Sequence, residues 1–111
     1  MSTLPQQIKD VVLELEKGLK EFYRDRFRGL LLYGSYARGT AWEGSDVDLL
    51  LLLEGPVNLS REIVETSDLV GDLSLDSGLV LAVMPADFGA YQRGESIFLS
   101  TVREEAVPVA A

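Results

Sequence analysis

The stretch GSYARGTAWEGSDVD, residues 34–48, decides the fold of this chain because it joins two apolar runs through a short polar segment. The runs at residues 30–33 and 49–53 are short, rich in leucine and bounded by turn residues, which is typical of buried strands. The Gly-Ser step ends the first run, and residues 35–41 are expected to form a short helix. The predicted local order is therefore strand, turn, short helix, turn and strand.

Two aspartates, Asp46 and Asp48, open the second apolar run. Side chains at i and i+2 of a strand point to the same face, so the two carboxylates should project together while Val47 points the other way. Unpaired carboxylates side by side repel, and such a pair binds a divalent cation, shares a proton or finds cationic partners. Mg²⁺ takes one or two carboxylates and completes its shell with substrate phosphates and water. The pair is therefore a candidate metal site.

The Gly-Ser step is a candidate anion site. Gly34 has no Cβ, so a phosphate can approach its backbone closely. If a helix begins at Ser35, its free N–H groups attract an anion, and the hydroxyl adds a donor. Arg38 lies three residues on, on the same side of that helix, and could reach a triphosphate. Together the two sites would hold a nucleoside triphosphate with its metal.

Each part of this pattern also has a purely structural explanation. A Gly-Ser step is usually only a turn, and Asp-x-Asp at the start of a strand is usually a solvated strand end. The combination at this spacing is more specific, and it resembles the nucleotidyltransferase signature of the DNA polymerase β superfamily: Gly-Ser, ten residues, then Asp-x-Asp. The matching residues are Gly34, Ser35, the interval 36–45, Asp46, Val47 and Asp48, with ARGTA at 37–41 and Ser45 also similar.

Length and element order are similar to those of the minimal nucleotidyltransferases, the stand-alone domains of that superfamily. The resemblance implies one nucleotidyltransferase domain over residues 1–111. It also implies two Mg²⁺ on the aspartate pair, a triphosphate on the Gly-Ser step, and transfer of a nucleotide to a hydroxyl with loss of pyrophosphate. The site residues carried over are Asp46 and Asp48 for metal and catalysis, Gly34 and Ser35 for the nucleotide, and Arg38 and Ser45 as extensions of the nucleotide site.

Composition limits what the chain can be. Its 111 residues allow one domain, and 47% hydrophobic with 25% charged residues is typical of a globular chain with a modest core. No apolar run approaches the roughly 20 residues that span a bilayer, and residues 1–9 lack the regions of a signal peptide. We therefore expect a cytoplasmic protein without a membrane partner. Cysteine and histidine are absent, which leaves carboxylates as bases and metal ligands.

The net charge of −8 disfavours nucleic acid as the main substrate, because a polyanion needs a basic footprint. Basic residues gather at residues 20–28, but acidic residues are interleaved with them, so a solvated helix face explains this segment better.

The pattern predicts an α/β (α+β) fold of order αβαβαβα, with a mixed sheet of three or more strands and helices packed on it. The expected helices are residues 5–27, 35–41, 60–75 and 96–105, with a short helix or turn at 87–93; the expected strands are 29–33, 47–53 and 79–84; residues 108–111 should fray. In the helix at 60–75, capped by Ser60, the residues expected to be buried are Ile63, Val64, Val70 and Leu73.

One departure from the family concerns a third acid. Catalytic members often carry it on the next strand, facing the pair, but residues 79–84 contain none. Asp72 and Asp76 precede that strand, and an ordinary polar helix end explains them better than a site does. Phosphoryl transfer depends chiefly on positioning and charge neutralisation, so two carboxylates can suffice.

Two functions stay open at this point. The first is an enzyme that transfers AMP from ATP to a hydroxyl of a partner. The resemblance to minimal nucleotidyltransferases implies that this hydroxyl is a tyrosine of an HEPN-domain RNase and that the chain acts as an antitoxin in a hetero-oligomer. The second is an inactive module of the same fold that neutralises a partner by masking it. A calcium loop is a poor third, because the required ligand series is missing.

Overall fold

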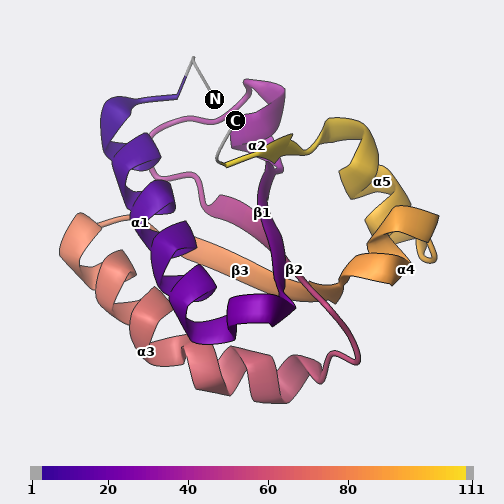
Figure 1. Cartoon of the computed structure of the whole chain (residues 1–111). Helices are drawn as coiled ribbons and strands as arrows, with labels where there is room; N and C mark the ends of the chain where they lie inside the picture. Colours follow the sequence, from indigo (N-terminus) through magenta and orange to yellow (C-terminus); the bar gives the residue numbers. More distant parts are fainter. Residues whose placement is uncertain (1–3, 110–111) are drawn as a thin grey trace.

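The structure, a computed structural model, describes residues 4–109 as a mixed α/β fold with helices on both faces of one sheet (Figure 1). Within those residues four strands lie in the order β3-β2-β1-β4. The strands are β1 (Phe27–Tyr33), β2 (Val47–Leu53), β3 (Leu81–Asp87) and β4 (Val107–Pro108). The helices are α1 (Gln6–Tyr23), the 3-10 helix η1 (Arg24–Arg26), α2 (Ser35–Arg38), α3 (Leu59–Ser77), α4 (Phe88–Arg93) and α5 (Ile97–Glu105). The predicted fold class is confirmed.

Strand pairing brings together segments that are far apart in the sequence. β1 and β2 are antiparallel, with Tyr33 opposite Asp48, and β2 and β3 are parallel, with Asp48 opposite Ala82. β4 pairs antiparallel with the other edge of β1, with Leu32 opposite Val107. The end of β1, the start of β2 and the chain after α5 therefore meet at one corner of the sheet.

β2 is buried on both faces, as its unbroken apolar run predicts. The residues that pack with α1 and α3 are Val47, Leu49, Leu51 and Leu53. Leu50 and Leu52 pack on the opposite face, with residues of α4 and α5; Figure 1 shows these two helices together, apart from α1 and α3. Because side chains alternate along a strand, Asp48 belongs to the α4–α5 face.

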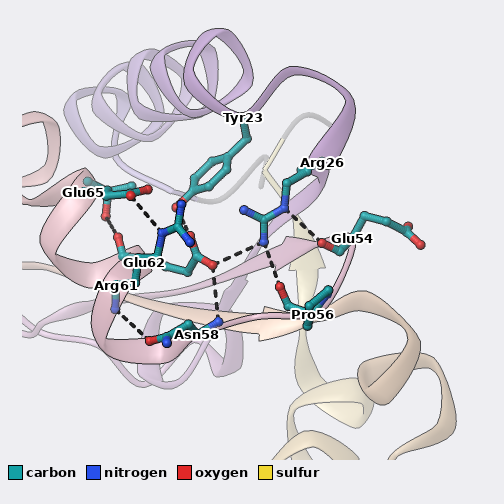
Figure 2. Close-up of polar contacts among 9 residues, drawn as sticks. Tyr23, Arg26, Glu54, Pro56, Asn58, Arg61, Glu62 and Glu65 are labelled. Atoms are coloured by element: carbon teal, nitrogen blue, oxygen red, sulfur yellow. Dashed lines mark hydrogen bonds and ion pairs between the residues drawn. The ribbon is translucent and has the colours of Figure 1, made fainter.

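A buried carboxylate, Glu62, links α3 to the end of α1 (Figure 2). It accepts hydrogen bonds from the Tyr23 hydroxyl (3.1 Å), the Arg26 guanidinium (3.2 Å) and the Asn58 N–H (3.4 Å). Burial alone would raise the pKa of Glu62, but these hydrogen bonds outweigh burial and lower it. Arg26 also donates to the carbonyl oxygens of Glu54 (3.2 Å) and Pro56 (3.1 Å), so the same side chain fastens the loop between β2 and α3.

The burial predicted for α3 is partly wrong. Ile63 and Val64 are exposed, at 45% and 71%, whereas Val70 and Leu73 are half-buried. The buried residues of this helix are instead Glu62 and Thr66. Polar side chains can occupy this face because Glu62 is fully partnered and the Thr66 hydroxyl donates to the Glu62 carbonyl oxygen at 2.8 Å.

The start of α3 differs from the predicted one by a residue or two. Asn58, rather than Ser60, caps the helix, because its side-chain oxygen accepts a hydrogen bond from the Arg61 N–H at 3.1 Å. The last two helices also have side-chain caps: Asp87 accepts from Ala90 N–H, and Ser96 accepts from Leu99 N–H.

The third strand begins later than predicted and continues past Pro85 to Asp87. β3 is an edge strand, and Val47 N–H donates to the Val80 carbonyl at 2.8 Å. Carried along the parallel register, this pattern turns the nitrogen of Pro85 away from β2. Its missing N–H therefore costs the ladder nothing, and the strand is not interrupted.

The first helix is shorter than predicted, and residues 108–109 are more ordered than predicted. The first helix ends at Tyr23 because Arg24 adopts a left-handed φ of 53°, and Phe27 already pairs with Leu53 in β1. Pro108, predicted to fray, lies in β4, and Val109 is buried. The same prediction for residues 110–111 lies outside the described residues.

Candidate functional site

The two aspartates lie at the corner where β2 begins. Asp46 is exposed and Asp48 is half-buried, whereas Val47 between them is fully buried on the face of α1 and α3. The two carboxylates therefore lie on the side away from Val47, as their spacing predicts.

Electrostatics at Asp48 favour a bound cation. Burial raises the pKa of Asp48, the charge of Asp46 raises it further, and Arg38 offsets only part of the effect. A divalent cation would relieve this repulsion, and two carboxylates are the hard oxygen donors that Mg²⁺ accepts. The donor set thus fits such a metal, although no group of three acidic or other metal-binding side chains gathers among residues 4–109.

Gly34 brings the backbone of the first strand against this pair. Its φ of 76° and ψ of −154° belong to a region that essentially only glycine adopts. A Cβ built at this position would overlap the carboxylate of Asp48. The glycine is therefore required both by its own conformation and by the close approach of Asp48.

The other predicted nucleotide residues are spread around this corner. Ser35 opens α2, which is a single turn, and Gly39 with a φ of 77° ends it well before residue 41. Arg38 is exposed at the end of that turn and is close enough for its charge to act on Asp48. Ser45 shapes the turn before Asp46: its hydroxyl accepts from the Trp42 N–H at 3.0 Å, and its own N–H donates to the Trp42 carbonyl at 2.9 Å.

Glu105, at the end of α5, is a charged neighbour that the sequence analysis missed. Its Oε2 accepts a hydrogen bond from Gly34 N–H at 2.7 Å and another from Arg38 Nη1 at 3.0 Å. Its charge also contributes to the raised pKa values of Asp48 and Tyr33, in which burial is the largest cause. One sequence signal could have found it: acidic residues oppose the helix dipole at the end of a helix, and α5 ends in Glu104 and Glu105.

The third metal-binding acid expected of catalytic relatives is not found with the pair in the described chain. Ala82 occupies the position of β3 opposite Asp48. Asp72 is exposed on α3. Asp76 lines a hollow with Val11 of α1, on the opposite side of the sheet from Asp48. Neither candidate acid therefore joins Asp46 and Asp48.

A hollow of about 500 Å³ lies near the Gly-Ser turn but is not lined by the aspartates. Tyr36 and Trp42 line it together with Ile8 of α1. Because Tyr36 packs with the core on the α1 face, this hollow lies behind the carboxylates rather than in front of them.

Comparison with known proteins places this chain in a family. Residues 12–95 match the family model described as a nucleotidyltransferase domain. This stretch is most of the chain and contains the Gly-Ser step and both aspartates, and the chain belongs to that nucleotidyltransferase family.

Relatives in Methanocaldococcus jannaschii carry the name "putative protein adenylyltransferase". One is 40% identical over 73 residues, which cover 60% of this chain and 67% of the relative. Another is 34% identical over 73 residues, covering 66% and 70%. A third is 32% identical over 71 residues, covering 64% of this chain and 46% of the relative, so the match spans about half the length of that protein.

Two solved structures share the fold. A chain of a toxin–antitoxin crystal structure with AMP-PNP aligns with a TM-score of 0.61 and 17% identity, covering 91% of this chain and 71% of the other. A "putative nucleotidyltransferase from Sulfolobus solfataricus" aligns with a TM-score of 0.59 and 17% identity, covering 93% and 76%. At these identities the likeness concerns the fold alone.

One further finding concerns membranes. Within residues 4–109, no helix has the length and apolar character needed to cross a bilayer.

Proposed function

We propose that residues 1–111 act as a single nucleotidyltransferase domain that moves AMP from ATP to a hydroxyl group of a partner protein. One observation carries this proposal. Asp46 and Asp48, whose charges repel each other, lie beside the backbone of Gly34, which has a conformation that essentially only glycine adopts, and within reach of the charge of Arg38. Membership of the nucleotidyltransferase family supports it.

Each residue has a task in the proposed reaction. Gly34 and Ser35 would hold the triphosphate by backbone N–H and hydroxyl, and Arg38 would neutralise part of its charge. Ser45 would keep the turn before Asp46 in place. The acceptor oxygen attacks the α-phosphorus, the bond from that phosphorus to the bridging oxygen breaks, and pyrophosphate leaves. Because no third acid completes a metal-binding group with the pair in residues 4–109, we assign the proton of the hydroxyl to water.

Asp46 and Asp48 would hold Mg²⁺. When bound, the metal supplies charge neutralisation at the phosphates, which is the larger part of catalysis of phosphoryl transfer. The two carboxylates would orient and fix it, and because the pKa of Asp48 is raised, protons would compete with the metal up to a higher pH than at an ordinary aspartate.

We further propose that the acceptor is a protein partner, in particular a tyrosine of an HEPN-domain RNase, and that the chain serves as its antitoxin. The names of the relatives support a protein as acceptor. The shared fold with a toxin–antitoxin structure supports the antitoxin role. The net charge of −8 favours a basic protein surface over nucleic acid.

Metal-dependent binding of ATP tests the site. Asp46→Asn combined with Asp48→Asn should abolish binding of ATP in the presence of Mg²⁺, measured by calorimetry, without unfolding the chain. Asp76→Asn is the matched control, because it also removes an acid but lies on the other side of the sheet. Equal ATP affinity in the double variant and the wild type would refute the assignment.

Transfer itself is measured as incorporation of label from α-labelled ATP into the partner, with and without Mg²⁺. Label that depends on Mg²⁺ and on the two aspartates, but not on Asp76, would establish the activity and the site together. Label lost on Asp76→Asn would show that this residue, rather than the pair alone, completes the site.

A masking module is the alternative function. The observation that favours it is Ala82 at the position on β3 where a third acid would face the pair. In this case the chain would bind and neutralise its partner without transferring label, and the partner would stay inhibited when both aspartates are replaced.

A further inference from the structure

The end of α5 places a carboxylate on the groups that would receive a triphosphate. Glu105 Oε2 accepts from both Gly34 N–H (2.7 Å) and Arg38 Nη1 (3.0 Å). Its side chain is only 20% exposed, whereas that of Arg38 is 53% exposed. The Glu105 carboxylate is thus well enclosed, whereas the Arg38 side chain has room to change its conformation.

Backbone pairing fixes this position. Val107 lies opposite Leu32 in the antiparallel pair of β4 and β1. Gly34 lies two residues after Leu32, and Glu105, the last residue of α5, lies two residues before Val107, so this pairing brings the two residues near each other. The carboxylate therefore reaches Gly34 because α5 ends where β4 begins, and not through a chance rotation of an exposed side chain.

The contact has the chemistry of a bound phosphate oxygen. A single anionic oxygen accepts a backbone N–H and a guanidinium N–H, both of which are charge-assisted hydrogen bonds. Its surroundings oppose it in two ways: Glu105 stands at the negative end of the dipole of α5, and its charge repels that of Asp48. The carboxylate is held by the groups that a phosphate would use, against forces that favour its departure.

We propose that Glu105 is an internal competitor of the nucleotide, occupying the triphosphate position at Gly34 and Arg38 until the nucleotide displaces it. This inference rests on the proposed function, because it names the regulation of the same site. Displacement needs only rotation of the Glu105 side chain, while β4 stays paired with β1. The chain then binds nucleotide more weakly than its site allows, by the fraction of time the position is open.

The test measures affinity for two probes, ATP with Mg²⁺ and inorganic tripolyphosphate, by calorimetry. Glu105→Gln removes the charge that competes and should raise affinity for both probes by about tenfold, as expected if the position is open about a tenth of the time. Glu105→Asp keeps the net charge but shortens the side chain, and should also raise affinity. Glu104→Gln makes the same change of charge on the exposed neighbouring residue and should leave affinity within about twofold of wild type.

The outcomes separate this inference from the proposed function. If ATP binds wild type and Glu105→Gln equally, and binding still needs Asp46 and Asp48, the function stands and the competitor is overturned. If Glu104→Gln gains as much as Glu105→Gln, net charge explains the effect and the competitor is again overturned. If ATP binds no variant, the proposed function fails; tripolyphosphate then decides, since a gain limited to the Glu105 variants supports the competitor and no gain overturns it.

Circular dichroism controls for folding. If Glu105→Gln does not fold, the shortened Glu105→Asp carries the same test, and a failure of its affinity to rise overturns the proposal.

Discussion

The absence of a Cβ at Gly34 matters both for the fold and for the candidate site. Its backbone conformation excludes a side chain, and the space that a Cβ would need is filled by Asp48. A substitution here therefore acts on the strand end and on the carboxylate at once.

Gly34→Ala should lower the free energy of unfolding by about 1–3 kcal/mol, because alanine must enter a region of φ and ψ that it avoids, and displacement of Asp48 adds to this cost. Gly71→Ala is the control. Gly71 lies inside α3, nothing lies within 4 Å of its would-be Cβ, and alanine there should stabilise by roughly 0.5–1 kcal/mol. Urea denaturation measures both. A Gly34→Ala variant as stable as wild type would contradict the conformation assigned to this turn.

Asp48→Asn should stabilise the chain at neutral pH by a few tenths to about 1 kcal/mol. The native pKa of Asp48 is raised, by burial first and by Asp46 second, so the folded state holds the proton more tightly than the unfolded state does. The unfavourable contribution of Asp48 begins near its ordinary pKa of about 3.9 and is complete above the raised value. The gain from Asp48→Asn should therefore vanish near pH 3 and be full at pH 7.

Melting curves across this pH range measure the effect. Asp72→Asn, at an exposed position of α3, should leave the difference from wild type near zero at every pH. A loss of stability in Asp48→Asn at neutral pH would show that the carboxylate is better partnered than its surroundings indicate.

At the scale of elements, one arginine fastens several parts of the fold to one another. Arg26 of η1 binds the buried Glu62 of α3 and two carbonyl oxygens of the loop that follows β2 (Figure 2). Arg28, two residues on, binds Glu54, and both of these side chains are about half exposed.

Arg26→Met should lower the free energy of unfolding by about 1–3 kcal/mol, because it leaves a buried carboxylate short of its charged partner. Arg28→Met should change it by no more than about 0.5 kcal/mol, since exposed ion pairs contribute little. Thermal and chemical denaturation of the two variants make the comparison. Equal losses would mean that Glu62 draws its stability from Tyr23 and Asn58 alone.

The pH profile gives the same pair a second test. The native pKa of Glu62 is lowered, so its stabilising contribution is present above the ordinary pKa and is lost as the pH falls through the lowered value. Without Arg26 the native pKa should rise, and the loss of stability should begin at a higher pH than in wild type.

Elements that one local signal decides could be predicted from the sequence. The bounds of β2 match the prediction, and α5 lies within the predicted range 96–105. Features that depend on distant partners could not. The exposure of Ile63 follows from the burial of Glu62, whose partners Tyr23 and Arg26 lie 39 and 36 residues away.

The candidate site divides in the same way. The aspartate pair and the glycine were predictable because their spacing along the chain encodes them. The contact of Glu105 with Gly34 was not predictable, although the acidic end of α5 is visible in the sequence. The two residues are 71 positions apart, and the contact depends on how the two-residue strand β4 pairs with β1. A short strand of this kind leaves almost no periodic signal.

At the scale of the whole molecule, the net charge of −8 sets the response to salt. Like charges repel in the folded state, and added salt screens them. A metal held by Asp46 and Asp48 would add a specific effect to this general one, because a ligand that binds only the folded state stabilises it.

MgCl₂ should therefore raise the melting temperature more than NaCl at equal ionic strength. In the Asp46→Asn and Asp48→Asn double variant the two salts should have the same effect, while Asp76→Asn should respond as wild type does. Differential scanning fluorimetry suffices for this comparison. Equal effects of the two salts on the wild type would show that the pair binds no magnesium in the absence of nucleotide.

The proline inside β3 has a consequence for how this molecule meets other chains. The outer edge of β3 is open, and its row of N–H donors is interrupted at Pro85. An uninterrupted edge recruits foreign strands and can grow into fibrils, and a proline blocks such growth. We therefore expect a protein that docks on this side to bind through side-chain contacts, which can be selective. Adding a strand to the sheet, which is open to any segment of high β-propensity, is disfavoured here.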